Sequence, residues 1–299
     1  MNRLSIIIPH AGDNERLETT LLSVLENRPE ACEVLVVLSD VYNDPYDLAT
    51  ENEVTFLYAP IGTDPVRCVN LGIDASQTPV VHLLPPGMTV LPGWSEAALA
   101  RLDRDPAVMS VAPLICGSEN QQLLSRGIHY GLGGAAINVT DENAPILGPS
   151  HYAAFYRKSA LVTLDRFDIE LGEAAADIDL ALKLHAIGGQ TATEPMCRVY
   201  FDRPITRRPV GLSSTRSMEQ LFWRWASKKG WIRSLASHLG QVIFDTMIQL
   251  PKPSTISSLF GRLLGLASIG SHHSLAKQLE AAQHRLARHD PEHPVRKAA

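Results

Sequence analysis

The segment VVHLLPPGMTVLPGW, Val80 to Trp94, joins a buried strand to a stiff turn. Its first five residues are apolar except for His82, which is typical of a strand inside a sheet. We expect His82 to be a core histidine rather than a ligand. The turn that follows, Pro-Pro-Gly at residues 85–87, carries no charged and no metal-binding side chain. The segment therefore predicts a strand that ends at a rigid, neutral corner.

Strands and helices alternate on both sides of this segment. Short apolar, β-branched runs predict further strands at residues 4–9, 32–40, 54–60 and 108–116. Apolar residues at helical spacing predict helices at residues 14–27, 64–76, 95–105 and 175–189. This alternation predicts an α/β fold with a mostly parallel sheet flanked by helices, and such sheets bind ligands at the carboxyl ends of their strands. The glycine-rich stretch at 127–139 lacks the spacing of a dinucleotide-binding loop, so we expect a flexible connection there.

Length and composition indicate a folded protein. The 299 residues are 45% hydrophobic and 20% charged, which argues against wholesale disorder and against an integral membrane protein. The four cysteines are scattered without any close pair, so neither a disulfide framework nor a zinc site is expected. The first residues lead directly into a strand and lack the pattern of a signal peptide. We therefore expect a cytoplasmic protein.

Charge divides the chain into two parts. Residues 1–206 contain 13 basic and 27 acidic residues, whereas the remainder contains 14 basic and 5 acidic residues. We expect amphipathic helices in residues 213–283 and a mobile polar tail at 284–299. The basic helices either pack on the acidic body or face an anionic membrane surface, which would make the protein peripheral on the inner face of the plasma membrane. No apolar run reaches the roughly 18 residues of a spanning helix. We expect no nucleic-acid partner.

Four segments, in order, carry a resemblance to a known family. They are SIIIPHAGDNERLETTLLSVLEN (5–27), CEVLVVLSD (32–40), VNLGIDASQTPVV (69–81) and the stretch at 156–188. They resemble the opening strand and helix, the second strand, the helix signature and the acceptor-side segment of the family 2 glycosyltransferases. The resemblance covers about residues 4–200. It implies the GT-A fold, a Rossmann-like domain here assigned to residues 1–206, with a C-terminal helical extension.

The resemblance also implies a set of donor-binding positions. Those that would contact the nucleotide sugar are Pro9, Ser39, Asp40, Asn70, Gly72, Pro85 and Gly87. The chain departs from the family at Val69, where an arginine is common, and at Leu38 and Ser39, where the family has acids that grip the base. For Asp40 the plain alternative is that it forms the turn before the Asn-Asp-Pro at residues 43–45.

A further departure concerns the metal. When the Pro-Gly-Trp at residues 92–94 is placed on the family's PGW, the turn at 85–87 falls on the metal-binding Asp-x-Asp. In the family this carboxylate pair holds Mn²⁺ or Mg²⁺, which neutralises the departing diphosphate. Proline and glycine cannot do so, and we expect no metal ligand here. Arg203, Arg207 and Arg208 could hold the diphosphate instead, since guanidinium groups bind phosphate in a fork, unless they are merely solvated.

The catalytic residues expected from the resemblance are Asp177 and Asp179. The family's acceptor-side segment ends in ED-x-DL, and here Ala176 replaces the glutamate while both aspartates remain. An inverting transfer needs one carboxylate within hydrogen-bonding reach of the acceptor hydroxyl, and Asp177 is the expected base. The alternative is that both carboxylates lie near a helix N-terminus as caps or dipole partners, without any chemistry.

Three functions remain open at this point. The first is an inverting glycosyltransferase of the hexosyltransferase type, which passes a sugar from a nucleotide-sugar donor to a glycan or lipid-linked acceptor in polysaccharide biosynthesis. The second is a catalytically inactive GT-A module that binds nucleotide, glycan or a partner enzyme as a scaffold. The third, a nucleotide-binding α/β protein unrelated to sugars, would require the four ordered segments to match by accident.

Overall fold

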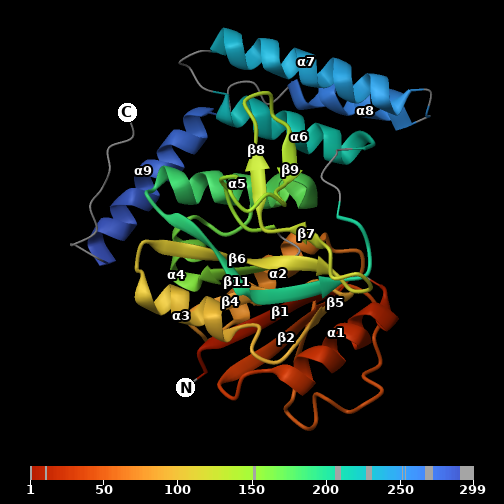
Figure 1. Cartoon of the computed structure of the whole chain (residues 1–299), viewed down its shortest axis with the longest axis vertical. Coiled ribbons are helices and arrows are strands. Elements are labelled where there is room, and N and C mark those ends of the chain that lie inside the picture. The colour runs from red at the N-terminus through yellow and green to blue at the C-terminus, as the bar shows by residue number, and fades with distance from the viewer. Residues whose placement is uncertain are drawn as a thin grey trace.

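A sheet of nine strands runs through the middle of the computed structural model, and helices cover both of its faces (Figure 1). The structure describes residues 2–10, 12–150, 153–205, 210–226, 231–250, 252, 254–266 and 272–289. Most neighbouring strands in the first half of the chain are parallel, as the sequence predicts.

The first half of the sheet is built from parallel strands joined by helices. Its spatial order is β3-β2-β1-β4, with all three pairings parallel. The strands are β1 (Leu4–His10), β2 (Cys32–Leu38), β3 (Thr55–Tyr58) and β4 (Val80–Leu83). The crossover helices are α1 (Asn14–Asn27) and α2 (Pro65–Ala75). Because these strands are parallel, their carboxyl ends meet at one edge of the sheet.

The second half of the sheet mixes directions. The strands here are β5 (Met88–Val90), β6 (Val108–Gly117), β7 (Leu123–Ser125), β10 (Ala154–Arg157) and β11 (Gln190–Phe201). Strand β10 lies antiparallel between β4 and β6, β11 runs parallel to β6, and β5 closes the edge antiparallel to β11. The helices are α3 (Glu96–Arg104), α4 (Lys158–Thr163), the short 3-10 helix η1 (Ile169–Leu171) and α5 (Gly172–Ala186).

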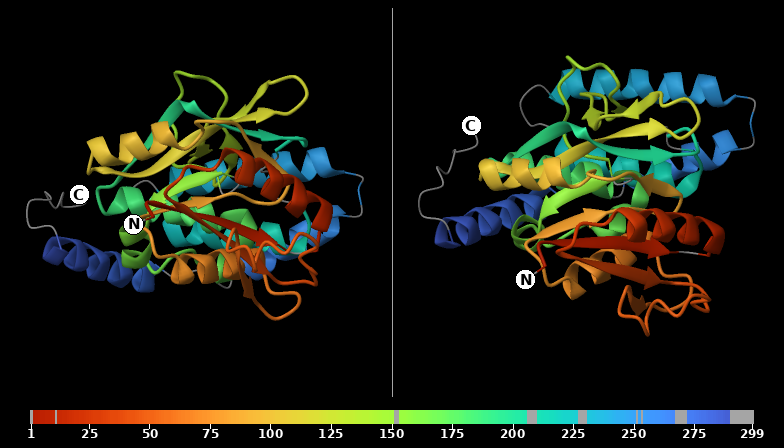
Figure 2. Two further views of the ribbon diagram at one scale, coloured as in Figure 1. Left: turned by 90° about the horizontal axis from the view of Figure 1, so that it is seen from below. Right: turned by 60° about the horizontal axis from the view of Figure 1, so that its bottom comes forward.

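Two apolar cores form, one on each face of the sheet. Along β1 the side chains alternate, so that Ile6 and Ile8 pack with α1 and α3 while Ile7 packs with α2 and α5. Figure 2 shows α1 and α2 on opposite faces of the sheet. His82 and Trp94 are buried, and His82 stacks on Phe155 with ring centroids 3.8 Å apart, as befits a core histidine.

The glycine-rich stretch at 127–139 is not the flexible connection expected from the sequence. It forms a hairpin of β8 (Ile128–Tyr130) and β9 (Ala136–Asn138), whose strands pair antiparallel. The backbone at Gly134 has φ of 85°, a conformation suited to glycine, at the turn. Strands of three residues are too short to show an alternating pattern, so this hairpin could not be predicted from the sequence.

Four helices follow the sheet: α6 (Leu212–Trp225), α7 (Trp231–Gln249), α8 (Ser254–Gly265) and α9 (His272–His289). Helix α6 packs against α5 and α8, and α9 packs against α4 and α6. Helix α9 extends to His289, so the first residues of the expected tail are helical, and the rest of that tail lies outside the described residues. Within the described part of the chain, no helix has the length and apolar character needed to cross a membrane.

Candidate functional site

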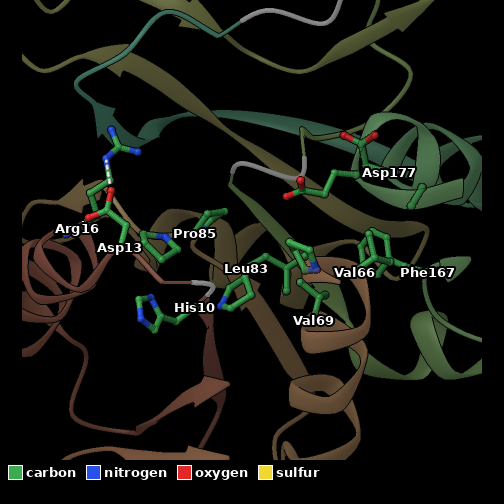
Figure 3. A pocket seen from close by; sticks show the side chains of 14 residues that line it. His10, Asp13, Arg16, Val66, Val69, Leu83, Pro85, Phe167 and Asp177 are labelled. Atoms are coloured by element: carbon green, nitrogen blue, oxygen red, sulfur yellow. Dashed lines mark hydrogen bonds and ion pairs between the residues drawn. The ribbon is translucent and has the colours of Figure 1, made fainter. Parts of the chain in front are cut away.

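A cavity of about 230 Å³ opens at the carboxyl ends of β1 and β4 (Figure 3). Pro9 and His10 end β1 and Leu83 ends β4. The remaining lining comes from the turn after β4, from α1 and its N-cap, from α2 and α5, and from the loop that carries Phe167. Ligands bind at this edge in open α/β sheets because the strand ends and helix N-termini converge there. The cavity therefore lies where the sequence predicts a ligand.

The neutral corner forms one wall of this cavity. Pro85 and Pro86 line it, and the turn is attached to α1 through Gly87, whose N–H lies 2.9 Å from Thr20 Oγ1 and 3.2 Å from the Arg16 carbonyl oxygen. Gly87 has φ of 90°, a conformation that favours glycine. The corner is thus rigid, and its side chains offer no oxygen or nitrogen to a ligand.

Asp177 lies on the opposite side of the same cavity (Figure 3). It occupies the second turn of α5 and is buried. Glu173, one turn earlier on the same helix, also lines the cavity. Nothing in the sequence marks Glu173 as a site residue, because an acid in the first turn of a helix is ordinary. The helix therefore brings two carboxylates to a cavity whose other walls are mostly apolar.

Asp179 takes a different position from Asp177. Its carboxylate forms an ion pair with Lys183 at 2.6 Å, accepts a hydrogen bond from Trp225 Nε1 at 2.8 Å and lies 3.4 Å from Arg224. Residues two apart on an α-helix point in nearly opposite directions, so the two aspartates cannot share one site. Asp179 joins α5 to α6 and is not among the residues that line the cavity.

Asn70 and Gly72 support the cavity from behind. The Asn70 amide donates to the Phe167 carbonyl oxygen at 2.8 Å and its Oδ1 accepts from the Phe167 N–H at 3.2 Å. A Cβ on Gly72 would lie 2.5 Å from Ile7 Cγ2, so glycine allows α2 to approach β1 closely. Asn70 thus fixes Phe167, which lines the cavity, and Gly72 fixes the helix.

Ser39 and Asp40 lie at the end of β2. Ser39 is buried and its hydroxyl donates to the His10 carbonyl oxygen at 3.0 Å. Asp40 is exposed, and its carboxylate lies beside Gly12, where a Cβ would come within 2.6 Å of Oδ2. Neither residue lines the cavity. Among the positions predicted to bind the nucleotide sugar, Pro9 and Pro85 are the two that do.

Arg16 is a cavity residue that the sequence analysis missed. Its guanidinium lies 2.6 Å from the Asp202 carboxylate and 3.6 Å from Asp13, and it stacks over the Phe201 ring at 5.3 Å. Gly87 lies directly beneath it, since a Cβ there would come within 2.9 Å of the Arg16 Cζ. The sequence shows only an arginine in the first turn of a helix, which is normally a solvated residue, so no local signal marks it.

Of the three loop arginines expected to hold the diphosphate, the structure describes Arg203. Arg203 is exposed, and it follows Asp202 directly in the chain. Arg207 and Arg208 lie outside the described residues. The cation that the described structure brings to the cavity is therefore Arg16, from α1.

His10 completes the polar part of the lining. Its Nε2 lies 2.8 Å from Asn14 Oδ1. Burial lowers the pKa of His10, although the hydrogen bond with Asn14 and the charges of Asp40 and Asp13 oppose this effect. The lowered pKa favours the uncharged imidazole, and Arg16 supplies the positive charge next to the neutral corner.

The residues present do not fit a divalent metal at the corner. Such an ion needs several oxygen ligands in a compact arrangement, and the side chains of the turn supply none. Among the described residues, no group of three or more His, Cys, Asp or Glu side chains is placed to hold a metal ion.

A larger cavity, of about 630 Å³, lies between the β8–β9 hairpin and α7. Two of its charged residues, Asp245 and Arg262, form an ion pair with each other at 2.7 Å. None of its lining residues also lines the smaller cavity. Because the chemistry expected from the sequence gathers at the smaller cavity, we assign the candidate site there.

Comparisons with known proteins concern the family of the chain and its fold, which is the GT-A fold expected from the sequence. The model of the family described as "Glycosyl transferase family 2" matches residues 5–164. No curated protein matches the chain. The crystal structure of S. aureus TarS 1-349 superposes with a TM-score of 0.60 at 15% identity, covering 96% of this chain and 92% of that one. The crystal structure of GalNAc-T7 with UDP, GalNAc and Mn²⁺ gives a TM-score of 0.63 at 13% identity, covering 98% of this chain and 59% of that one. At such identities the structural likeness concerns the fold.

Proposed function

Because the chain belongs to glycosyl transferase family 2, we propose that it passes a sugar from a nucleotide-sugar donor to a glycan or lipid-linked acceptor, with inversion at the anomeric carbon. At the level of the family it is a glycosyltransferase. One observation carries the finer proposal: Asp177 and the two prolines of the corner, Pro85 and Pro86, line the same cavity at the carboxyl ends of β1 and β4.

Asp177 is the proposed general base. As the acceptor hydroxyl attacks the anomeric carbon, its proton passes to the Asp177 carboxylate and the bond to the nucleoside diphosphate breaks. The base must lie across the sugar from the leaving group, and Asp177 faces the neutral corner and Arg16 across the cavity (Figure 3). Attack from that side inverts the configuration at the anomeric carbon.

Arg16 is the proposed partner of the departing diphosphate. A guanidinium binds phosphate oxygens through charge-assisted hydrogen bonds, and it remains positive at any physiological pH. Asp202 and Phe201 hold this group next to the corner, where the metal-binding carboxylates would stand in the family. We therefore propose transfer without a metal at this corner. Arg203 remains a candidate for the outer phosphate, as do Arg207 and Arg208.

The neighbours and the size of the cavity support a nucleotide-sugar donor. One TarS crystal structure is a complex with UDP, at 14% identity and a TM-score of 0.59, and the GalNAc-T7 structure contains UDP and GalNAc. The cavity is smaller than the roughly 300–1,000 Å³ of common ligand pockets. We infer that it receives the sugar and diphosphate, while the nucleoside lies on the open side near Ser39 and Asp40.

The test is turnover by the purified protein with a panel of UDP, GDP and TDP sugars and glycan or lipid-linked acceptors. We expect Asp177→Asn to lower kcat by at least about a hundredfold, the usual loss for a missing general base, with little change in donor affinity. Glu119→Gln, at an exposed site, is the matched control and should keep full activity. Donor binding without turnover by the native chain would instead favour the inactive scaffold, which the neutral corner also suits.

A further inference from the structure

Helices α7 and α8 have their polar side turned inward. On α7 the buried residues are Ser234, His238, Asp245 and Gln249, which form one stripe along the helix. On α8 they are Thr255, Ser258, Gly261 and Gly265. A surface helix of a water-soluble protein normally buries its apolar stripe instead. Helices α7 and α8 therefore bury their polar side and expose their apolar side, the reverse of an ordinary surface helix.

Specific contacts hold the helices in this orientation. His238 Nδ1 lies 2.8 Å from the Gly133 carbonyl oxygen, and its Nε2 lies 3.0 Å from Glu219 on α6. Arg262 on α8 forms an ion pair with Asp245 on α7 at 2.7 Å, and Ser258 donates to Gln249 Oε1 at 3.0 Å. Any Cβ on Gly261 or Gly265 would collide with α6. The polar side is thus fixed against the body, and the other side must face outward.

The outward side of α7 and α8 is a broad apolar surface. Exposed side chains include Ile232, Ile243 and Met247 on α7, and Ile256, Phe260 and Leu263 on α8. Their exposure is high, with Met247 at 69%, Ile256 at 77% and Leu263 at 63%. Figure 1 shows the two helices together at one end of the molecule, with α6 between them and α5. Contiguous apolar surface of this kind marks a site of interaction.

The charges around this surface are all positive. Residues 231–266 contain one acid, Asp245, and it is buried and paired with Arg262. The exposed charged residues of the pair, within the described part of the chain, are Arg233 and Lys252, one near the start of α7 and one in the α7–α8 connection. If two copies paired through this surface, these cations would meet no exposed acid. Anionic headgroups would complement them.

We propose that the apolar side of α7 and α8 inserts into the acyl layer of a lipid bilayer at its interface, with the two helices lying flat and Arg233 and Lys252 among the headgroups. Insertion removes these side chains from water, and the polar stripes continue to face the protein. This inference does not depend on the proposed reaction. It differs from simple charge attraction because most of the free energy comes from apolar burial, which salt does not screen.

Flotation of the full chain with vesicles tests the proposal. We expect binding to phosphatidylcholine vesicles, stronger binding when phosphatidylglycerol is included, and binding that persists at high NaCl. The double variant Ile256→Glu/Leu263→Glu should lower the partition coefficient by at least about tenfold, because two buried charges oppose insertion. The matched control is Ile61→Glu/Met196→Glu, at sites exposed by 78% and 75% elsewhere on the surface, and it should bind like the native chain.

Three results would overturn the proposal. In the first, the native chain does not float with the vesicles. In the second, binding requires phosphatidylglycerol and is lost at high NaCl. In the third, the chain binds no lipid but dimerises, and Ile256→Glu/Leu263→Glu abolishes the dimer. A second measurement does not depend on how that variant folds. Met247→Trp places an indole on the outward side of α7, and brominated lipids should quench the fluorescence of this variant more strongly than that of the native chain. Equal quenching in both proteins would also reject the insertion.

Discussion

The guanidinium of Arg16 is placed by the residues around it. Asp202 at 2.6 Å, the Phe201 ring and the close backbone of Gly87 restrict it to the space above the neutral corner. A carboxylate pair at the corner would need a metal to offset the charge of a diphosphate, whereas an arginine supplies positive charge directly. In this arrangement Arg16 supplies the positive charge that a metal would supply if residues 85–87 carried acids.

His82 provides a prediction about pH. Burial lowers the pKa of His82 to about 3, against 6.5 for an exposed histidine, although the hydrogen bond between its Nδ1 and the Ala154 carbonyl oxygen opposes this effect. As the pH falls below 6.5 the unfolded chain takes up a proton that the folded chain refuses, so stability decreases toward pH 3. Between pH 7 and pH 5 this should cost about 2 kcal/mol.

Urea unfolding at the two pH values measures this effect. In His82→Gln the part of the pH dependence that His82 causes should disappear, whatever the stability of that variant at pH 7. His129→Gln, at an exposed histidine, should keep the native dependence. If His82→Gln lost as much stability on acidification as the native chain, the assignment of the effect to His82 would be wrong.

The sequence predicted the site residues only where a motif marks them. Pro85 and Asp177 follow motifs, and the structure places both at the cavity. Asp179 follows the same motif but points to Arg224 and Lys183, because spacing along a helix sets its direction. Arg16 reaches the cavity through contacts with residues almost two hundred positions away, and such contacts leave no local pattern.

At the scale of elements, the contact between α2 and β1 depends on Gly72. In Gly72→Ala the new methyl group would meet Ile7 at 2.5 Å, inside a filled core. We expect a loss of about 1–3 kcal/mol in the free energy of unfolding, despite the better helix propensity of alanine. The matched control is Gly240→Ala on α7, where no atom lies within 4 Å, and it should be neutral or stabilising by up to about 1 kcal/mol.

Thermal or urea unfolding compares the two alanine variants directly. We expect Gly72→Ala to have a lower free energy of unfolding than Gly240→Ala, because both variants replace a helical glycine and differ in the atoms that the new methyl group contacts. Equal stabilities for Gly72→Ala and Gly240→Ala would show that the approach of α2 to β1 is not tight.

The long, periodic elements could be predicted from the sequence. The short strands, and the side of α7 and α8 that faces the body, could not. The strands and helices predicted between residues 4 and 189 were confirmed, because each is a continuous apolar run or shows a helical period. The β8–β9 hairpin has strands of three residues, and α9 continues into a polar sequence that gave no helical signal. In α7 and α8 the sequence shows an amphipathic pattern but not which side faces the body. That choice depends on Glu219, Gly133 and other partners elsewhere in the chain.

At the scale of the whole molecule, Arg224 connects the C-terminal helices to the sheet domain. It lies 2.6 Å from Asp168 and 3.4 Å from Asp179. Burial alone would raise the pKa of Asp168, but the hydrogen bond and charge of Arg224 lower it. Asp168 therefore stabilises the fold above the pKa it has when unfolded, and that contribution is lost as the pH falls through its lower folded pKa.

Arg224→Met should cost about 3 kcal/mol at neutral pH, since it leaves two poorly solvated carboxylates short of a partner. The control is Arg3→Met, which removes an exposed pair with Asp103 and should cost less than about 1 kcal/mol. Urea unfolding at pH 7 gives both values. Similar small losses in the two variants would mean that α6 is held to the domain by its apolar contacts alone.

The central claim is that the cavity beside residues 85–87 binds a nucleoside diphosphate through Arg16 without a metal. Isothermal titration of the full chain with UDP, GDP and TDP, in EDTA and then in Mn²⁺, tests it most directly. We expect a dissociation constant that changes less than about twofold with metal and rises at least about tenfold in Arg16→Ala, with Arg101→Ala unchanged. A dissociation constant that tightens tenfold or more with Mn²⁺, or is unaffected by Arg16→Ala, would contradict the claim.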